Sequence, residues 1–458
     1  MKLAIVLVLL VIFTLVFHFV SPWWFTPLAS NWSSIDFTVN VTFWVTGLVF
    51  IAVNLFLAYV VFRYRYSPKR KADYDPENRK LETSLTLLTT VGVVLMLAPG
   101  LFVWAKFIDV PKNASQVEVL AQQWHWSYRF PGEDGVFGKT HAHFISDLNP
   151  MGLDPKDLNG QDDIIVEDNQ LHLPQGQPAK VLLRSKDVLH NFAVPQFRVK
   201  MDAVPGLVSY VWFTPEKLGV YDILCMELCG IAHYAMRGKV VVETSSEFKV
   251  WLAEQPTFAQ SQQTATRDLA AGKSLYMVCA SCHGQQAQGS VVSKAPALAG
   301  QHQSYIVRQL QHYQQSIRGT YEADDLGRQM ASMSSTLPDL KALQDVAAYV
   351  ESLSHINSPA TIRNADVKRG EKVYQNCARC HGQEGEGNLA LSAPKLAGLQ
   401  DWYVRRQIHF FQHGLRGGHE ADYFGNQMQL LAKTLNSEQA IDDVAVFISQ
   451  MKNNAVQK

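Results

Sequence analysis

Long apolar stretches are confined to the first quarter of the chain. They run from about 3 to 20, 42 to 63 and 84 to 106, and each approaches the length of about 20 residues that a helix needs to cross a bilayer. After residue 106 the composition becomes that of water-soluble domains. The pattern therefore predicts a membrane anchor over 1–115 with soluble domains behind it.

The first apolar stretch has two interpretations. Lys2 followed by an apolar run also describes a secretory signal peptide. The run is longer than the usual signal core, and Ser21 to Trp24 offers no clear small-residue cleavage site, which favours a retained anchor.

Basic residues set the orientation of the spans. The loop between the second and third spans carries Lys or Arg at 63, 65, 69–71, 79 and 80, whereas 21–41 carries none. The positive-inside rule places this loop in the cytoplasm. Everything after 106 is then expected on the periplasmic side of a bacterial inner membrane, with or without the first stretch.

Short runs of β-branched and aromatic residues recur behind the anchor. They lie at 117–120, 179–184, 210–213 and 238–243 and are typical of strands. We expect an all-β sandwich or barrel over 116–250, a linker over 251–264, and two all-helical domains over 265–355 and 356–458. Each helical domain ends in an amphipathic helix, with 346–349 and 444–447 on its packed face.

Length and charge narrow the function only a little. A chain of 458 residues has room for three or four domains, and its 41 basic and 41 acidic residues give no reason to expect a nucleic-acid partner. The six cysteines form three close pairs, at 225 and 229, 279 and 282, and 377 and 380. Such pairs indicate ligands or covalent attachment rather than a disulfide framework, and they leave no cysteine over.

Two C-x-x-C-H patterns stand 98 residues apart, as Cys279-Ala-Ser-Cys282-His283 and Cys377-Ala-Arg-Cys380-His381. Two thiols at this spacing can form thioethers with one porphyrin, and the histidine then reaches the iron. One C-x-x-C could also be a redox dithiol or half a zinc site. The same register without a gap, however, matches ten further residues: Gly272, Tyr276, Ala295, Pro296, Leu298, Gly300, Arg318, Glu322, Asp324 and Leu337 recur at 370, 374, 393, 394, 396, 398, 416, 420, 422 and 435. A duplicated haem-binding domain explains this repeat.

The repeat also predicts the sixth ligand of each haem. Met330 aligns with Met428, whereas Met333 aligns with Leu431. We therefore expect Met330 and Met428 to be the axial ligands. A thioether opposite a histidine raises the potential, which suits an electron carrier.

The third cysteine pair lies in a loop of soft ligands. Within twelve residues stand Cys225, Cys229, His233 and Met236, a set that selects copper over hard cations. A mononuclear blue-copper centre needs one thiolate, and a zinc site has no use for the methionine. Two thiolates four positions apart can each bridge two metals, so we expect a dinuclear site.

These motifs resemble two known families. C-x-E-x-C-x-x-x-H-x-x-M over 225–236 is similar to the CuA signature of cytochrome c oxidase subunit II, and 187–192 and 200–206 resemble that family's first-ligand strand and following turn. The repeat over about 265–458 resembles class I cytochromes c, in particular tandem dihaem cytochromes. The subunit II resemblance implies copper ligation by His190, Cys225, Cys229, His233, Met236 and the backbone carbonyl of Glu227. In that family the glutamate side chain also binds magnesium or manganese where subunit II meets subunit I.

Two further positions match the family less specifically. The run 123–128 resembles its aromatic segment, in which the residue matching Trp124 lies on the path by which electrons enter, although such strands are more often plain core. Glu82 matches a glutamate at the mouth of a proton pathway. The Trp and Pro that usually follow are missing here, and a charge at a membrane boundary is also explained by solvation.

Taken together, the resemblances imply subunit II of a terminal cytochrome c oxidase. Electrons would pass from a donor through two c-type haems and CuA to subunit I, where O2 is reduced to water with proton pumping. The implied partners are subunits I and III, with a cytochrome c or a quinol–cytochrome c reductase as donor. Two alternatives stay open, namely a CuA-bearing nitric oxide or nitrous oxide reductase and a non-enzymatic electron shuttle or copper-delivery protein. The sequence leaves open which haem receives electrons first.

Overall fold

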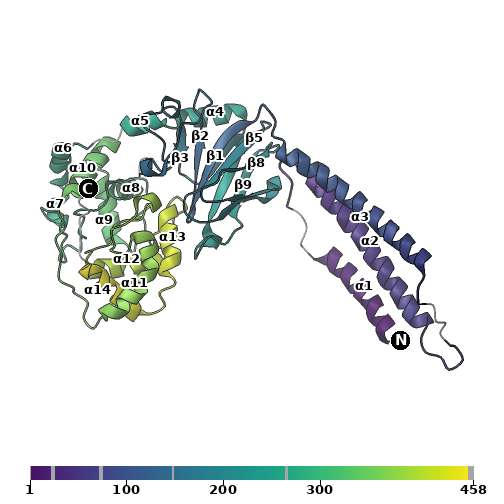
Figure 1. Ribbon diagram of the computed structural model, residues 1–458. Helices are drawn as coiled ribbons and strands as arrows, with labels where there is room; N and C mark the ends of the chain where they lie inside the picture. The colour runs from purple at the N-terminus through teal and green to yellow at the C-terminus, as the bar shows by residue number, and fades with distance from the viewer. Residues whose placement is uncertain (1, 22–25, 72–75, 147–148, 264–266, 452–458) are drawn as a thin grey trace.

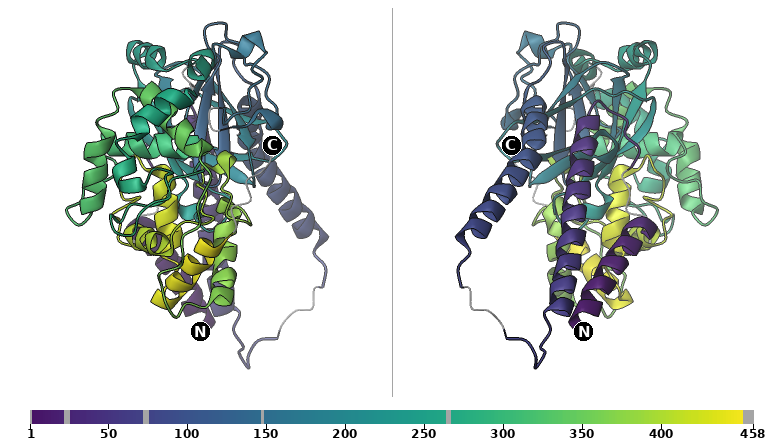
Figure 2. Two further views of the ribbon diagram at one scale, coloured as in Figure 1. Left: turned by 90° about the vertical axis from the view of Figure 1, so that its left-hand side faces the viewer. Right: turned by 90° about the vertical axis from the view of Figure 1, so that its right-hand side faces the viewer.

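The chain is built of three regions arranged in series. A computed structural model describes residues 2–21, 26–71, 76–146, 149–263 and 267–451. A β-sandwich lies between a group of long apolar helices on one side and a mass of short helices on the other (Figure 1). Figure 2 shows the short helices from their outer side and the long helices from theirs.

The apolar helices confirm the predicted membrane anchor. They are α1 (Lys2–Val20), α2 (Ser33–Arg63) and α3 (Arg79–Ile108), and each is long and apolar enough to cross a bilayer. The soluble domains follow α3, which fits their periplasmic location. Residues 22–24, on which the choice between anchor and signal peptide depends, lie outside the described residues, so the retained anchor stays a prediction.

Two tryptophans tie the anchor to the β-sandwich. The indole N–H of Trp32, at the start of α2, donates to the carbonyl of Trp212 at 3.1 Å, and their ring centroids are 4.8 Å apart. The indole of Trp212 in turn donates to the carbonyl of Lys106 near the end of α3, at 3.2 Å. Arg198 also pairs with Asp36 of α2 at 2.6 Å. These contacts fix the sandwich at the outer end of both helices.

The β domain consists of two five-stranded sheets. Their strands are β1 (Ser115–Gln122), β2 (His125–Phe130), β3 (Ile164–Val166), β4 (Gln170–Pro174), β5 (Ala179–Ser185), β6 (His190–Val194), β7 (Val199–Ala203), β8 (Ser209–Phe213), β9 (Gly219–Cys225) and β10 (Arg237–Glu243). One sheet has the order β3-β2-β1-β5-β8 and the other β4-β10-β9-β6-β7. Buried residues of both sheets form one core, so the predicted all-β domain is a sandwich.

A buried ion cluster lies among these strands. Arg129 of β2 pairs with Glu118 of β1 at 2.5 Å and with Asp163, just before β3, at 3.0 Å. The guanidinium also donates to the carbonyl of Gly138 at 2.9 Å, and Arg184 of β5 provides Glu118 with a second partner at 2.8 Å. Each buried charge thus has a partner, as burial demands.

The predicted linker over 251–264 is largely helical. It contains the end of α4 (Ser245–Glu254) and α5 (Phe258–Gln263). Thr244 and Glu247 form a capping box at the start of α4. Trp251 then stacks on His172 of β4, with ring centroids 4.0 Å apart. The aromatic contact holds α4 against the sandwich.

Two helical domains follow, as predicted. The first contains α6 (Leu269–Tyr276), α7 (Ala280–His283), α8 (Gln303–Gln314), α9 (Asp325–Ser334) and α10 (Leu340–Ser352), and the second contains α11 (Val367–His381), α12 (Asp401–Gln412), α13 (Tyr423–Ala432) and α14 (Glu438–Gln450). In each copy the first and last helices cross at a repeated glycine. A Cβ on Gly272 would lie 2.0 Å from the carbonyl oxygen of Asp345, and one on Gly370 would lie 2.2 Å from that of Asp443. Only glycine allows this close approach.

Candidate functional site

One of the two sheets, β4-β10-β9-β6-β7, brings the predicted copper ligands together at one end of the sandwich. Cys225 ends β9, and β9 pairs with β6, where Phe192 lies opposite Cys225. His190, two residues before Phe192, therefore reaches the loop between β9 and β10. That loop carries Cys229, His233 and Met236, so strand pairing unites residues that are 35 or more positions apart.

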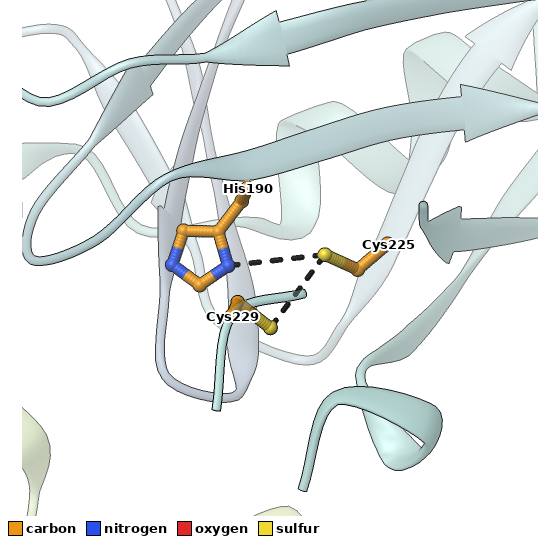
Figure 3. A group of neighbouring side chains, drawn as sticks. All are labelled: His190, Cys225 and Cys229. Carbon is orange, nitrogen blue, oxygen red and sulfur yellow. Dashed lines mark hydrogen bonds between the residues drawn. The ribbon is translucent and has the colours of Figure 1, made fainter. Parts of the chain in front are cut away.

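The donor atoms form a compact cluster, in which His190, Cys225, Cys229 and Met236 are buried and His233 is half-buried. The sulfurs of Cys225 and Cys229 are 3.6 Å apart, and Nδ1 of His190 lies 3.9 Å from the sulfur of Cys225 (Figure 3). Nδ1 of His233 lies 3.6 Å from the sulfur of Cys229, and Sδ of Met236 lies 3.8 Å from it. Each thiol thus has one imidazole beside it.

Residues outside the cluster orient and polarise the ligands. Nε2 of His190 lies 2.8 Å from a carboxylate oxygen of Asp187, which leaves Nδ1 facing the sulfurs. The hydrogen bond with Cys229 lowers the pKa of Cys225 to about 3 against the effect of burial, and His190 adds to the decrease. The same contact raises the pKa of Cys229. The opposite directions of the two pKa shifts favour one thiolate and one thiol in the pair, and metal binding would displace the remaining proton.

The cluster fits the dinuclear copper centre that the sequence predicts. Its donors are two adjacent sulfurs, one imidazole beside each sulfur, and a thioether, all of them soft or borderline ligands. The backbone carbonyl of Glu227 lies 3.2 Å from the sulfur of Cys225, within reach of the same centre.

Trp124 is buried directly against the copper loop. The neighbouring Gln123 donates from its side chain to the carbonyl of Cys229 at 2.6 Å and from its backbone to Asp187 at 2.6 Å. A Cβ on Gly230, whose φ is +126°, would lie 3.0 Å from the indole ring of Trp124. The glycine lets the indole lie flush with the loop, beside Cys229.

Glu82 lies apart from the copper ligands. It is an exposed residue in the first turn of α3, at the end of that helix remote from the sandwich. The structure does not join it to the other predicted site residues, and its role in proton transfer stays a prediction.

Both predicted haem histidines are held in the same way. Nδ1 of His283 lies 2.8 Å from the carbonyl of Pro296, and Nδ1 of His381 lies 2.8 Å from that of Pro394. Burial lowers the pKa of both imidazoles, against the effect of these hydrogen bonds. A neutral imidazole that donates through Nδ1 presents Nε2 as a ligand, which is the form that haem iron binds.

The second helical domain contains a cavity that fits a haem. Its lining includes all four predicted attachment and ligand residues of that copy: Cys377, Cys380, His381 and Met428. The cavity is also lined by buried Arg416, whose Nε has no hydrogen-bond partner among the described residues. A haem carries propionate groups, and an anionic oxygen would satisfy this buried donor.

The choice between Met330 and Met333 rests on the repeat. Both are half-buried on α9, and the structure does not separate them. We expect Met330→Leu to lower the potential of the first haem and to abolish the sulfur-to-iron charge-transfer band of its ferric spectrum, because the thioether ligand is lost. Met333→Leu is the matched control and should leave potential and spectrum unchanged. The opposite pattern would contradict the repeat alignment.

Several residues of the site escaped the sequence analysis. Asp187 and the carbonyls of Pro296 and Pro394 orient the histidines, and Gln427 of α13 donates to the carbonyl of Trp124 at 3.2 Å. The two prolines are conserved between the repeat copies, which was an available signal. No sequence spacing indicates that Gln427 meets Trp124, 303 positions earlier.

Comparison with known families accounts for most of the soluble part. The family model described as cytochrome c oxidase subunit II, periplasmic domain, matches residues 116–245, and the cytochrome c model matches 269–354 and 367–452. These families imply a CuA centre and haem. A curated relative, alternative cytochrome c oxidase subunit 2 of Bradyrhizobium diazoefficiens, is 55% identical over 259 residues, which cover 57% of this chain and 94% of the relative.

Solved structures match the β domain and the two helical domains separately. Reduced recombinant cytochrome c4 from Pseudomonas stutzeri covers 41% of this chain and 100% of its own, with 27% identity and a TM-score of 0.34. The periplasmic domain of cytochrome oxidase subunit II, CoxB, of Bradyrhizobium japonicum covers 32% of this chain and 95% of its own, with 30% identity and a TM-score of 0.24. On the curated relative and the matched family models, this chain belongs to the cytochrome c oxidase subunit II family and carries two cytochrome c domains behind its copper domain.

Proposed function

We propose that the chain is the electron-receiving subunit of a terminal oxidase. Electrons pass from a donor through the two cytochrome c domains and the copper domain to subunit I, which reduces O2 to water with proton pumping. The observation that carries the proposal is the cluster of buried Cys225, Cys229, His190 and Met236 with half-buried His233, against which Trp124 lies.

The resident groups would supply one-electron redox chemistry, and the protein holds them in place. The cluster would hold two coppers, and each C-x-x-C-H motif would bind one covalent haem, with His283 and Met330 as the iron-binding residues of the first copy and His381 and Met428 as those of the second. Burial keeps water from the cluster, and Asp187 fixes the ring of His190. The rigid sandwich limits movement of the ligands during a change of charge.

A surface beside the cluster suits contact with subunit I. Met226, Leu228, Ile231 and Tyr234 of the copper loop are all exposed, although they surround buried ligands. An exposed apolar group of this kind marks a protein contact. Glu227 lies within the same surface, and we propose that its side chain binds magnesium or manganese where the two subunits meet. Subunit III, and a cytochrome c or quinol–cytochrome c reductase as donor, complete the proposed assembly.

Isolation of the chain from its membrane tests this function against the alternatives. We expect copurification with a large membrane protein that contains non-covalent haem, and equal amounts of copper and covalent haem iron in the chain itself. A pyridine haemochrome assay and elemental analysis measure both quantities. A nitric or nitrous oxide reductase would reduce those gases in place of O2, a shuttle would purify alone, and one copper per two irons would contradict the dinuclear centre.

The proton pathway gives a separate prediction. Glu82 is a titratable group at the cytoplasmic end of α3, where such groups are often functional. Glu82→Ala should slow steady-state O2 reduction several-fold, because protons reach subunit I less readily, while copper and haem contents stay unchanged. Glu77→Ala, which removes an exposed carboxylate just before the same helix, is the matched control. Equal rates of O2 reduction in both variants would show that Glu82 is only a solvated surface residue.

A further inference from the structure

One helix of the second cytochrome c domain docks on the copper domain. At its start, the rings of Tyr423 and Phe424 lie on His125, with centroids 5.8 and 5.3 Å from the imidazole. At its centre, Gln427 donates to the carbonyl of Trp124 at 3.2 Å. Figure 1 shows this helix, α13, between the sandwich and the other helices of its domain.

Further along α13 the contact is apolar. Leu430 and Leu431 pack against the core of the sandwich. The same helix carries Met428, the predicted ligand of the second haem. The helix that supplies an iron ligand is thus also the helix that docks.

Trp124 contacts both sites at this junction. Together with Gln123 it lines the cavity that also contains Cys377, Cys380 and Met428. On its other side the indole lies against Gly230, next to Cys229. Electron transfer in proteins slows steeply with distance, so a residue that borders both sites marks the shortest connection between them.

The two repeat copies differ at the docking positions. Where the second copy has Tyr423, Phe424, Leu430 and Leu431, the first has Asp325, Leu326, Ser332 and Met333. Asp325 is exposed and pairs with Arg328 of its own helix. The second methionine helix therefore carries a docking face that the first lacks.

The first copy has an exposed apolar surface instead. Met277 and Val278 directly precede the attachment cysteine Cys279, and Val291 and Val292 precede Ser293, which donates to the carbonyl of Cys282 at 2.9 Å. These four apolar residues are 56%, 53%, 55% and 96% exposed. In the second copy, Gln375 and Asn376 replace the first two of these residues. Figure 1 places α7, which carries Cys282, on the side of the first domain away from the sandwich.

We propose that the second cytochrome c domain is the one that reduces the copper domain, across the α13–Trp124 contact, and that the first domain receives electrons from the donor at its apolar surface. The inference rests on the proposed function and orders its steps. The occupant of that surface is a redox protein with an apolar contact face. At each contact one electron is transferred, the preceding domain is oxidised and the following one is reduced, with no atom exchanged.

Contact between the two cytochrome c domains completes the sequence. Arg318 of the first domain donates to Gln407 of the second at 3.1 Å, and Arg416 of the second donates to Tyr305 and Gln309 of the first at 2.6 and 3.2 Å. These buried or partly buried bonds join the domains around the cavity of the second copy. Electrons can therefore pass from the first domain to the second while the two domains stay in contact.

The order can be tested in the full complex by giving α13 the residues of the first copy. The variant Tyr423→Asp with Leu430→Ser is mixed with a reduced mono-haem cytochrome c, and haem and copper absorption are followed by stopped flow. We expect copper reduction to slow at least about tenfold, while the second-order rate of haem reduction stays within about twofold. The matched control, Asp325→Ala with Ser332→Ala, should leave both rates unchanged.

The receiving surface is tested by a pair of equivalent positions. Val291→Asp should lower the second-order rate of haem reduction about tenfold and leave the internal copper reduction unchanged. Leu389→Asp, at the same position of the second copy, should change neither rate. If the donor reduced the haems of the Leu389→Asp variant more slowly than those of the Val291→Asp variant, the order of the two domains would be reversed and the proposal overturned.

Two further measurements distinguish a misfolded variant, a wrong order of electron transfer and a wrong proposed function. Equal copper and haem contents in all variants show that they are folded, and the milder variant Gln427→Ala should still slow copper reduction several-fold. Unchanged copper reduction in both α13 variants would overturn the proposed order alone. Copper that is never reduced in the unmodified complex would instead overturn the proposed function.

Discussion

Cys229→Ser should abolish most oxygen uptake while the cytochrome c domains still become reduced. The substitution removes one of two sulfurs that lie 3.6 Å apart, and Cys229 also contacts His233 and Met236. Loss of groups that only support metal ligands already costs about 10- to 100-fold in affinity or activity, so loss of a central ligand should exceed that. Stopped-flow reduction of the mutant complex should show normal cytochrome c reduction, little reduction of the haem of subunit I, and at least a 100-fold lower oxygen uptake.

The control for this variant is a serine on β9, the strand that leads into the copper loop. Val220 is exposed on β9 and remote from the loop, so Val220→Ser should leave copper content and turnover unchanged. Near-normal oxygen uptake by a folded, copper-depleted Cys229→Ser complex would show that the cytochrome c domains bypass the copper domain. The proposed path would then have to be abandoned.

Arg129→Met should be the most destabilising single change in the sandwich. It leaves Glu118 and Asp163, both buried, without their shared partner. Breaking a buried ion pair in this way costs about 3–5 kcal/mol. The denaturant midpoint at which the copper absorption disappears reports unfolding of this domain, while the haem bands report on the other two.

A second arginine of the cluster provides the control for Arg129→Met. Arg184 contacts only Glu118 among these acids, and its side chain is 24% exposed, against 4% for Arg129. Arg184→Met should therefore cost less, about 1–2 kcal/mol. A midpoint for Arg129→Met that equals that of the unmodified protein would show that the buried cluster contributes little to stability.

The loss in Arg129→Met should also grow with pH. Burial raises the pKa of Asp163 to about 6, and Arg129 acts in the opposite direction. Without the guanidinium, the pKa of the folded state rises further above the value of about 3.9 in the unfolded chain. A raised pKa contributes stability below the unfolded value and loses it as pH rises through the folded value. The mutant should thus lie closest to the wild type near pH 4 and fall furthest behind it above pH 6.

Features that are local in the chain could be predicted from the sequence. The three apolar helices, the four strand runs and the two helical domains were all predicted. The spacing of apolar residues and the length of each apolar run, which indicate such elements, can be read from a short window of sequence. The haem motifs and most of the copper loop were predicted for the same reason. Two thiols and an imidazole must lie within a few residues to hold one group, so spacing alone reveals them.

Contacts between distant segments could not be predicted from spacing. His190 entered the candidate copper set through a family resemblance, and it reaches Cys225 only because β6 pairs with β9. In the predicted linker, α4 is held against the sandwich by the stacking of Trp251 on His172, 79 positions earlier in the chain. Such contacts depend on the packing of whole elements, which a local pattern does not encode.

The two repeat copies separate most clearly what the sequence could predict from what depends on the tertiary structure. Alignment of the copies established that there are two equivalent haem-binding domains and named Met330 and Met428, but it treated the copies alike. Only the fold gives them different neighbours: α13 lies on Trp124, whereas Val292 of the first copy faces outward. The asymmetry arises because α13 buries the apolar Leu430 and Leu431 against the core of the sandwich, where the first copy has Ser332 and Met333.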